Sequence, residues 1–174
     1  MIVGKQTTVF WNVEDLKMSH VDPKEVTKFM EWIEDIYRDL RITRGKVEEY
    51  LGTTLDLRTP GDLWGTMVDY LKGVLEDLIE VITRRSKSPT ANHTFQVSPE
   101  DKRELLDNER ETGFHHMLAQ LLFFTSRSSK DIKMAIGLLY NQVKIPDKDD
   151  WENLVRILRY IRGNLHLPLI LRSY

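Results

Sequence analysis

The sequence predicts an α+β fold, in which a β-hairpin and short antiparallel strands come first and a mostly helical region follows. Residues 6–61 contain short runs rich in Val, Thr, Phe and Trp, separated by turn residues, which is typical of strands. From residue 66 onward, apolar residues recur every three or four positions, which is typical of amphipathic helices. A chain of 174 residues with 41% hydrophobic content suffices for one ordinary domain or for two small subdomains that share a core.

The first predicted element is a β-hairpin. Residues 6–12 and 16–21 are rich in β-branched and aromatic side chains, and they flank two adjacent carboxylates, Glu14 and Asp15. We therefore expect two short strands with this acidic pair at the tip of the turn.

A helix is predicted over residues 23–40. Asp22 is a capping residue, Pro23 suits the first helical position, and Glu25 places an acid in the first turn. The apolar residues that follow share one helical face, namely Val26, Phe29, Met30, Ile33 and Tyr37.

Residues 41–57 predict a strand, a turn and a second strand. Gly45 and Gly52 interrupt the run, and an alternating stretch ends at the turn residues 59–61. Residues 66–82 then carry an apolar stripe at helical spacing, and the polar stretch 83–93 that breaks it is the best candidate for a linker.

The remaining residues predict further helices and one last strand. Ser98, Pro99 and Asp101 predict the start of a helix, and residues 114–124 are apolar on most sides, so we expect them to be buried. Three more elements are indicated by capping residues, apolar spacing and a closing Gly163: helices over 129–143 and 147–163, and a strand over 167–171.

Composition excludes several classes of protein and site. The chain has no cysteine, which excludes disulfides, thiolate zinc sites and a cysteine nucleophile and leaves histidine and carboxylates as metal ligands. There is no apolar run near 18 residues and no signal-peptide pattern, so we expect a soluble intracellular protein, cytoplasmic or nuclear, without a membrane partner.

The charge is distributed unevenly along the chain. Residues 1–112 carry 16 Lys and Arg against 22 Asp and Glu, a balance of −6, whereas residues 113–174 carry 9 against 5, a balance of +4. The C-terminal part is therefore the better candidate for contact with a polyanion, and a plain solvated surface is the alternative.

The acidic pair Glu14 and Asp15 is the first candidate site. Two neighbouring carboxylates repel one another, so they persist at little cost in water or beside a cation that neutralises them. Polymerases use such carboxylates to hold two divalent ions during phosphoryl transfer. An acidic turn that holds no ion is the alternative.

The segment VFWNVEDLKMSHVD, residues 9–22, resembles the hairpin motif of reverse transcriptases, an aromatic residue, any residue and two Asp. It is most similar to the version in copia-type retrotransposon polyproteins, where a close form reads W-H-V-D-D-L-K-I-S-H-V-D. Segments that resemble later parts of that family follow in the same order along almost the whole chain: 45–57, the strand pair that grips the primer end; 66–78, the entry to the thumb; 114–139; and 144–163, the run before the ribonuclease H domain.

The resemblance implies a function for the whole chain. Residues 1–64 would form part of a polymerase palm and residues 65–174 a helical thumb or connection region. The family activity is RNA-directed DNA synthesis by two-metal nucleotidyl transfer. The resemblance implies Mg²⁺ or Mn²⁺ as cofactor, Glu14 and Asp15 as its ligands and catalytic residues, and as partners an RNA template, a DNA primer and the remaining polymerase and ribonuclease H segments of a polyprotein.

The chain also departs from the family pattern. The family aromatic residue corresponds to Asn12, and its first metal-binding Asp corresponds to Glu14, whose carboxylate reaches one methylene further than Mg²⁺ geometry favours. No Asp or Glu precedes Glu14, so the family's upstream metal-binding Asp has no counterpart. If Met1 is the true start, the site cannot be completed within this chain, and the alternative function is a non-catalytic module that binds nucleic acid or protein.

Other residues are weaker candidates. Arg156, Arg159 and Arg162 recur every three residues, so they can follow phosphates or can pair with Asp149 and Glu152 as a solvated face.

The same resemblance suggests two nucleic-acid contacts near the predicted strand pair, Lys46, in a loop near the nucleotide phosphates, and Gly52. Trp11, Trp32 and Trp64 are expected in the core or at subdomain contacts, because each adjoins apolar residues.

Overall fold

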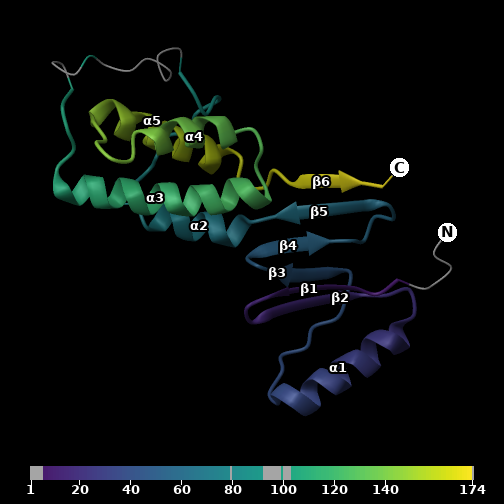
Figure 1. The fold of residues 1–174 in the computed structure, drawn as a ribbon. Coiled ribbons are helices and arrows are strands. Elements are labelled where there is room, and N and C mark those ends of the chain that lie inside the picture. The colour runs from purple at the N-terminus through teal and green to yellow at the C-terminus, as the bar shows by residue number, and fades with distance from the viewer. Residues whose placement is uncertain (1–5, 79, 92–98, 100–102, 174) are drawn as a thin grey trace.

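The computed structural model describes residues 6–78, 80–91, 99 and 103–173. The fold is α+β, with an antiparallel hairpin, a four-stranded antiparallel sheet and helices gathered mostly in the C-terminal half (Figure 1). Among the described residues, no helix is both long enough and apolar enough to cross a membrane.

The N-terminal hairpin forms as predicted. Strand β1 (Thr8–Asn12) pairs antiparallel with β2 (Asp15–Ser19), and the register places Asn12 opposite Asp15. This register leaves a two-residue turn between the strands, which is the shortest common hairpin connection.

Helix α1 (Pro23–Tyr37) also starts where the sequence predicts. The side chain of Asp22 accepts a hydrogen bond from the backbone N–H of Lys24, and the proline takes the first helical position. The helix ends three residues before the predicted end at residue 40, because Arg38 and Asp39 both adopt positive φ angles, of 44° and 57°.

The four-stranded sheet has the order β3-β4-β5-β6. Its strands are β3 (Val47–Tyr50), β4 (Thr53–Asp56), β5 (Asp62–Thr66) and β6 (Leu169–Arg172). The strand pair around Gly52 and the last strand confirm two predictions, whereas β5 was not predicted. The sheet therefore combines strands from both sides of the boundary at residue 64.

Four helices form the C-terminal bundle, and its first member is shorter than the sequence indicates. The helices are α2 (Val68–Glu76), α3 (Asn108–Arg127), α4 (Lys133–Asn141) and α5 (Lys148–Gly163). The apolar stripe over 66–82 predicts a longer α2, yet Leu78 and Ile82 are buried beyond its end without helical backbone. Of the predicted start of the next helix, Ser98 and Asp101 lie outside the described residues, and α3 begins after its capping residue, Asp107.

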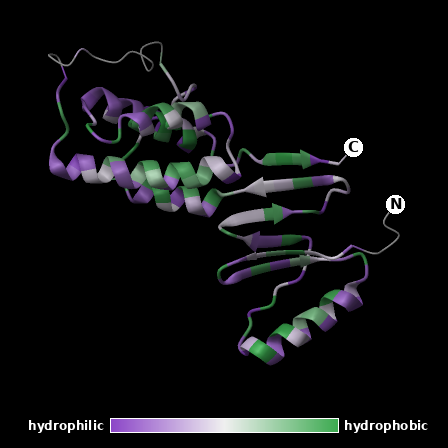
Figure 2. Cartoon of the chain, in the orientation of Figure 1, coloured by the Kyte–Doolittle hydropathy of each residue, from purple (hydrophilic) through white to green (hydrophobic). Residues whose placement is uncertain are grey.

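The hydrophobic core lies almost wholly among α2, α3, α4 and α5. Phe114, Leu121 and Ile136 are fully buried there, and the apolar residues of 114–124 contribute to this core as predicted. Within residues 6–66, Ile33 is the single buried apolar side chain. Figure 2 shows hydrophobic positions on α1, which stands at the opposite end of the sheet from the bundle.

Candidate functional site

Glu14 and Asp15 lie at the tip of the β1–β2 hairpin, and both are exposed. Glu14 occupies the turn, and Asp15 is the first residue of β2. The indole Nε1 of Trp11 donates a hydrogen bond of 3.0 Å to the carbonyl of Val13, which braces the turn. Val13 has a φ of 51°, a left-handed conformation that a β-branched residue rarely adopts.

Neither carboxylate at the tip is neutralised by the residues that the structure describes. In the part of the chain that the structure describes, no hydrogen bond or ion pair involves the side chain of Glu14 or Asp15. The bend is a strand-to-strand turn, and arginines do not cover it. The pair is therefore free to contact water, a cation or another chain segment.

The described residues do not complete a divalent-metal site. No group of three or more His, Asp or Glu side chains among them is placed to hold a metal ion. Mg²⁺ demands near-ideal octahedral geometry, and two exposed carboxylates on a short turn do not impose it. Any metal held at this tip needs a further ligand from outside the described residues.

Two contacts hold the hairpin to its neighbours. Lys17 of β2 forms an ion pair with Glu48 of β3, which joins the hairpin to the edge of the four-stranded sheet. Trp11 meets Tyr37 of α1 edge to face, with 6.0 Å between ring centroids. The acidic tip thus belongs to a unit made of β1, β2 and α1 that contacts the sheet through β3.

The tryptophans lie outside the core, contrary to one part of their prediction. Trp11, Trp32 and Trp64 are 55%, 56% and 37% exposed. Trp11 nevertheless contacts Tyr37 of α1, which agrees with the predicted role of these tryptophans at contacts between elements. Apolar neighbours in the sequence did not predict burial, because the elements that carry these residues leave one face uncovered.

Gly52 and Lys46 lie near the β3–β4 hairpin. The register of Tyr50 with Thr53 leaves Leu51 and Gly52 as a two-residue turn, and both have positive φ, of 50° and 70°. Glycine accommodates this conformation best, so the turn itself accounts for Gly52. Lys46 is exposed, and its carbonyl accepts the backbone N–H of Leu57 at 2.6 Å.

A small cavity of ≈ 210 Å³ adjoins this turn. Apolar side chains of the four-stranded sheet line most of it, and the side chain of Arg127, from the end of α3, adds a charged group. The guanidinium of Arg127 lies 3.7 Å from the ring centroid of Phe123. Pockets for small molecules usually measure roughly 300–1,000 Å³, so this cavity is too small to be the main candidate site.

The three arginines of α5 differ in exposure. Arg159 is exposed, whereas Arg156 and Arg162 are half-buried. In the described part of the chain, no ion pair joins them to Glu152 or to another carboxylate. The Nε of Arg156 is buried and has no hydrogen-bond partner among the described residues.

The structure brings a second basic segment to α5, which the sequence interpretation missed. The backbone N–H of Ser86 donates a hydrogen bond of 3.2 Å to the carbonyl of Arg159. This contact places Arg84, Arg85 and Lys87, all exposed, next to the end of α5. The sequence predicts a linker here, and the three cations within residues 84–87 are the feature of the sequence that indicates a basic segment.

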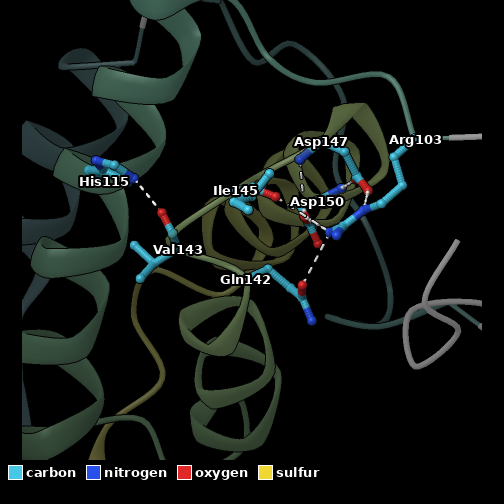
Figure 3. Close-up of polar contacts among 7 residues, drawn as sticks. All are labelled: Arg103, His115, Gln142, Val143, Ile145, Asp147 and Asp150. Atoms are coloured by element: carbon cyan, nitrogen blue, oxygen red, sulfur yellow. Dashed lines mark hydrogen bonds and ion pairs between the residues drawn. The ribbon is translucent and has the colours of Figure 1, made fainter. Parts of the chain in front are cut away.

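A polar cluster at the start of α5 is structural (Figure 3). Asp147 caps the helix, and its side chain accepts the backbone N–H of Asp150 at 3.0 Å while the side chain of Asp150 accepts that of Asp147 at 3.1 Å. The Nε of Arg103 donates to Asp147 at 2.9 Å, and its Nη2 donates to Gln142 at 3.2 Å. The cluster anchors the segment before α3 to the start of α5.

The two carboxylates of this cluster have different pKa values. Burial raises the pKa of Asp150 to about 6, and the nearby carboxylate of Asp147 adds to this effect. Burial also opposes ionisation of Asp147, but its hydrogen bond from the backbone of Asp150 and the guanidinium of Arg103 outweigh burial and lower the pKa of Asp147. Asp147 therefore keeps its negative charge opposite Arg103, whereas ionisation of Asp150 is unfavourable.

The adjacent histidines of α3 act separately. A ring nitrogen of His115, Nε2, lies 2.6 Å from the carbonyl oxygen of Val143, and Nε2 of His116 lies 3.7 Å from a carboxylate oxygen of Asp77. Adjacent helical residues point about 100° apart, so these two do not converge on one ion.

The chain is similar to a protein of Saccharomyces cerevisiae named as a transposon Ty5-1 protein. The two are 25% identical over 166 residues, which cover 92% of this chain and 50% of the other protein. This chain therefore spans about half the length of the curated relative that it matches. No protein-family model and no solved structure matches it. The chain is a distant relative of a transposon protein.

Proposed function

We propose that the chain is a segment of a retrotransposon reverse transcriptase, comprising the later part of the palm and a helical thumb-like region. The observation that carries the proposal is the β1–β2 hairpin, which exposes two unneutralised carboxylates, Glu14 and Asp15, at its tip. The similarity to a transposon protein over 92% of the chain supports the same assignment.

The activity belongs to a longer enzyme. RNA-directed DNA synthesis uses divalent ions, Mg²⁺ or Mn²⁺, to stabilise the attacking and leaving oxygens of nucleotidyl transfer. The hairpin supplies two carboxylates, and a further ligand must come from outside the described residues. The isolated chain is therefore expected to be inactive, and its partners are the remaining polymerase and ribonuclease H segments, an RNA template and a DNA primer.

Mapping the 5′ end of the transcript tests this proposal. The expected transcript continues upstream of Met1 in the same reading frame into a strand that carries an Asp. The protein made from that frame should extend a DNA primer on an RNA template when Mg²⁺ is present. A transcript that starts at Met1, or a longer protein that incorporates no nucleotide, would overturn the enzyme assignment.

A non-catalytic binding module is the second candidate. The observation that favours it is the pair of basic segments, 84–87 and the arginines of α5, for which the described residues provide no ion-pair partner. Such a module would retain contact with nucleic acid or protein after losing catalysis. A transcript that begins at Met1, together with nucleic-acid binding by the purified chain, would support this candidate.

A further inference from the structure

The polar segment 83–91 is folded against the C-terminal half of α5. The hydrogen bond from Ser86 to the carbonyl of Arg159 joins the two backbones. A Cβ at Gly163 would lie 3.7 Å from Cβ and 3.8 Å from Cδ of Arg85, which is ordinary packing distance. Figure 1 shows the chain passing α5 after α2. The two elements therefore form one surface.

The conformation of this segment is fixed locally. The hydroxyl of Ser86 donates to the carbonyl of Ser88 at 2.8 Å, and the hydroxyl of Ser88 donates to the carbonyl of Thr90 at 2.9 Å. Such side-chain to backbone bonds stabilise turns. The cations of the segment are thus held beside α5.

These two packed elements carry six positively charged residues, and we refer to them as the basic surface: Arg84, Arg85, Lys87, Arg156, Arg159 and Arg162. Within the described part of the chain, none of the six makes an ion pair with a carboxylate. Like charges this close repel one another, so their assembly costs free energy unless an anion compensates it.

The protein offsets only part of this cost. The carbonyl end of α5 favours cations nearby through the helix dipole, an effect confined to the last turn. Arg156 lies two turns before the end of the helix, and its buried Nε has no acceptor among the described residues. Buried donors usually have a hydrogen-bond partner, so this Nε adds to the unbalanced positive charge beside the exposed cations, which an anion on the surface would offset.

The geometry points to the phosphate backbone of a nucleic acid. The row from Arg156 to Arg162 spans six helical positions, or about 9 Å at 1.5 Å per residue. Phosphates on one strand of a duplex follow one another at about 3.4 Å along its axis. A row of this length can contact two or three phosphates, whereas a single small anion would need cations that converge on one point.

We propose that the basic surface binds the phosphate backbone of a nucleic-acid duplex. This inference rests on the proposed function, because it names the surface through which a reverse-transcriptase segment of this kind would hold its template and primer. It adds Arg84, Arg85 and Lys87 to the arginines of α5.

The test is binding of the purified 174-residue chain to an RNA–DNA hybrid duplex, measured by fluorescence anisotropy over a series of salt concentrations. The test variant combines Arg84→Gln, Arg85→Gln and Lys87→Gln, since glutamine keeps the side chain as far as Cδ and with it the packing against Gly163. Each lost phosphate contact should reduce the slope of log K against log salt by about 0.9. We expect a reduction of about 2 to 3 and at least a tenfold loss of affinity.

The matched control removes three exposed positive charges at the other end of the molecule, with Lys24→Gln, Lys28→Gln and Arg41→Gln. It changes the net charge equally, so it should bind almost as the unchanged chain does. A third variant, Arg84→Lys with Arg85→Lys and Lys87→Arg, keeps all three charges. It should bind as tightly as the unchanged chain if positive charge is the property that matters. Circular dichroism must give the same helix content and melting temperature for all variants.

Three results would contradict the proposal. Equal losses of affinity in the test and control variants would overturn the proposed role of the basic surface, and the proposed function would then be tested by primer extension alone. Absence of binding by the unchanged chain, even at 50 mM salt, would overturn nucleic-acid contact altogether. Equally tight, variant-sensitive binding to poly-glutamate would overturn the nucleic-acid assignment in favour of an acidic protein partner.

Discussion

At the scale of single residues, the hairpin tip combines exposure with backbone strain. Val13 is 85% exposed and has a positive φ, so its side chain gains little from burial and its backbone is unfavourable. Strained residues persist where the surrounding structure fixes them, and they are frequent at functional sites. Here the strain lies directly beside the two carboxylates of the candidate site.

Replacing Val13 by glycine should therefore stabilise the hairpin. The left-handed conformation costs a residue with a Cβ about 1–2 kcal/mol, and glycine loses part of this gain through greater freedom in the unfolded chain. We expect Val13→Gly to raise the free energy of unfolding by about 0.5–1 kcal/mol in urea titrations. Val9→Gly, at an ordinary strand position in β1, is the control and should lower it.

Asp150 provides a second prediction at this scale. Its pKa is raised from the usual value to about 6 in the folded protein, so folding becomes less favourable as pH rises between about 4 and 6 and Asp150 ionises. Asparagine can accept the same backbone hydrogen bond without the charge. We expect Asp150→Asn to gain stability relative to the unchanged protein, on the order of 2 kcal/mol, as pH rises from 4 to 7.

Thermal melts at intervals between pH 4 and 7 measure this difference. Asp149→Asn, at an adjacent exposed position, serves as the control for removing one negative charge. A constant difference between Asp150→Asn and the unchanged protein over this range would contradict the raised pKa.

At the scale of elements, the start of α5 is fixed more firmly than the start of α3. Both helices have an Asp cap, but Asp147 is buried, takes part in a reciprocal capping box and pairs with Arg103. Asp107, the cap of α3, is exposed and accepts one backbone N–H, from Arg110 at 2.8 Å. Among the described residues, the shortest ion pair of Arg103 is the one with Asp147, at 2.9 Å.

These differences predict unequal losses on truncation. Asp107→Ala should cost about 1 kcal/mol, as is usual for an exposed helix cap. Asp147→Ala should cost about 3 kcal/mol, because it also removes the carboxylate that lies closest to the half-buried Arg103 guanidinium among the described residues. Urea unfolding followed by circular dichroism compares the two variants, and equal losses would show that the Arg103 contact contributes nothing.

The elements predicted correctly are those with local signals. The acidic turn, the Asp22–Pro23 helix start and the capping residue Asp147 each specify structure within a few residues. Strand β5 pairs with the neighbouring β4 as well as with β6, and it was missed because its five residues, DLWGT, include an Asp and a Gly, which are depleted in strands. The contribution of residues 84–87 to the basic surface was missed because they reach α5 only through tertiary contact.

At the scale of the whole molecule, the hairpin and α1 lack a covering layer. Trp32, Ile36 and Tyr37 are 56%, 52% and 57% exposed, and Trp11 extends this apolar surface across the hairpin. Exposed apolar patches of this kind mark interfaces or promote association.

The isolated chain should therefore self-associate through this surface. Sedimentation velocity at increasing concentration should detect dimers or larger species, and the double variant Trp32→Gln, Ile36→Gln should shift the protein toward monomer. Val81→Gln, at a more exposed apolar residue outside the N-terminal unit, should leave association unchanged. A chain that stays monomeric at every concentration would contradict this prediction.

Primer extension by the protein made from the longer reading frame tests the central claim, that Glu14 and Asp15 face the metal site of a reverse transcriptase. Asp15→Asn should abolish Mg²⁺-dependent incorporation, and Glu14→Asp, which shortens the side chain by one methylene, should increase it. Incorporation that is unchanged in Asp15→Asn, or full activity of the 174-residue chain alone, would contradict the account.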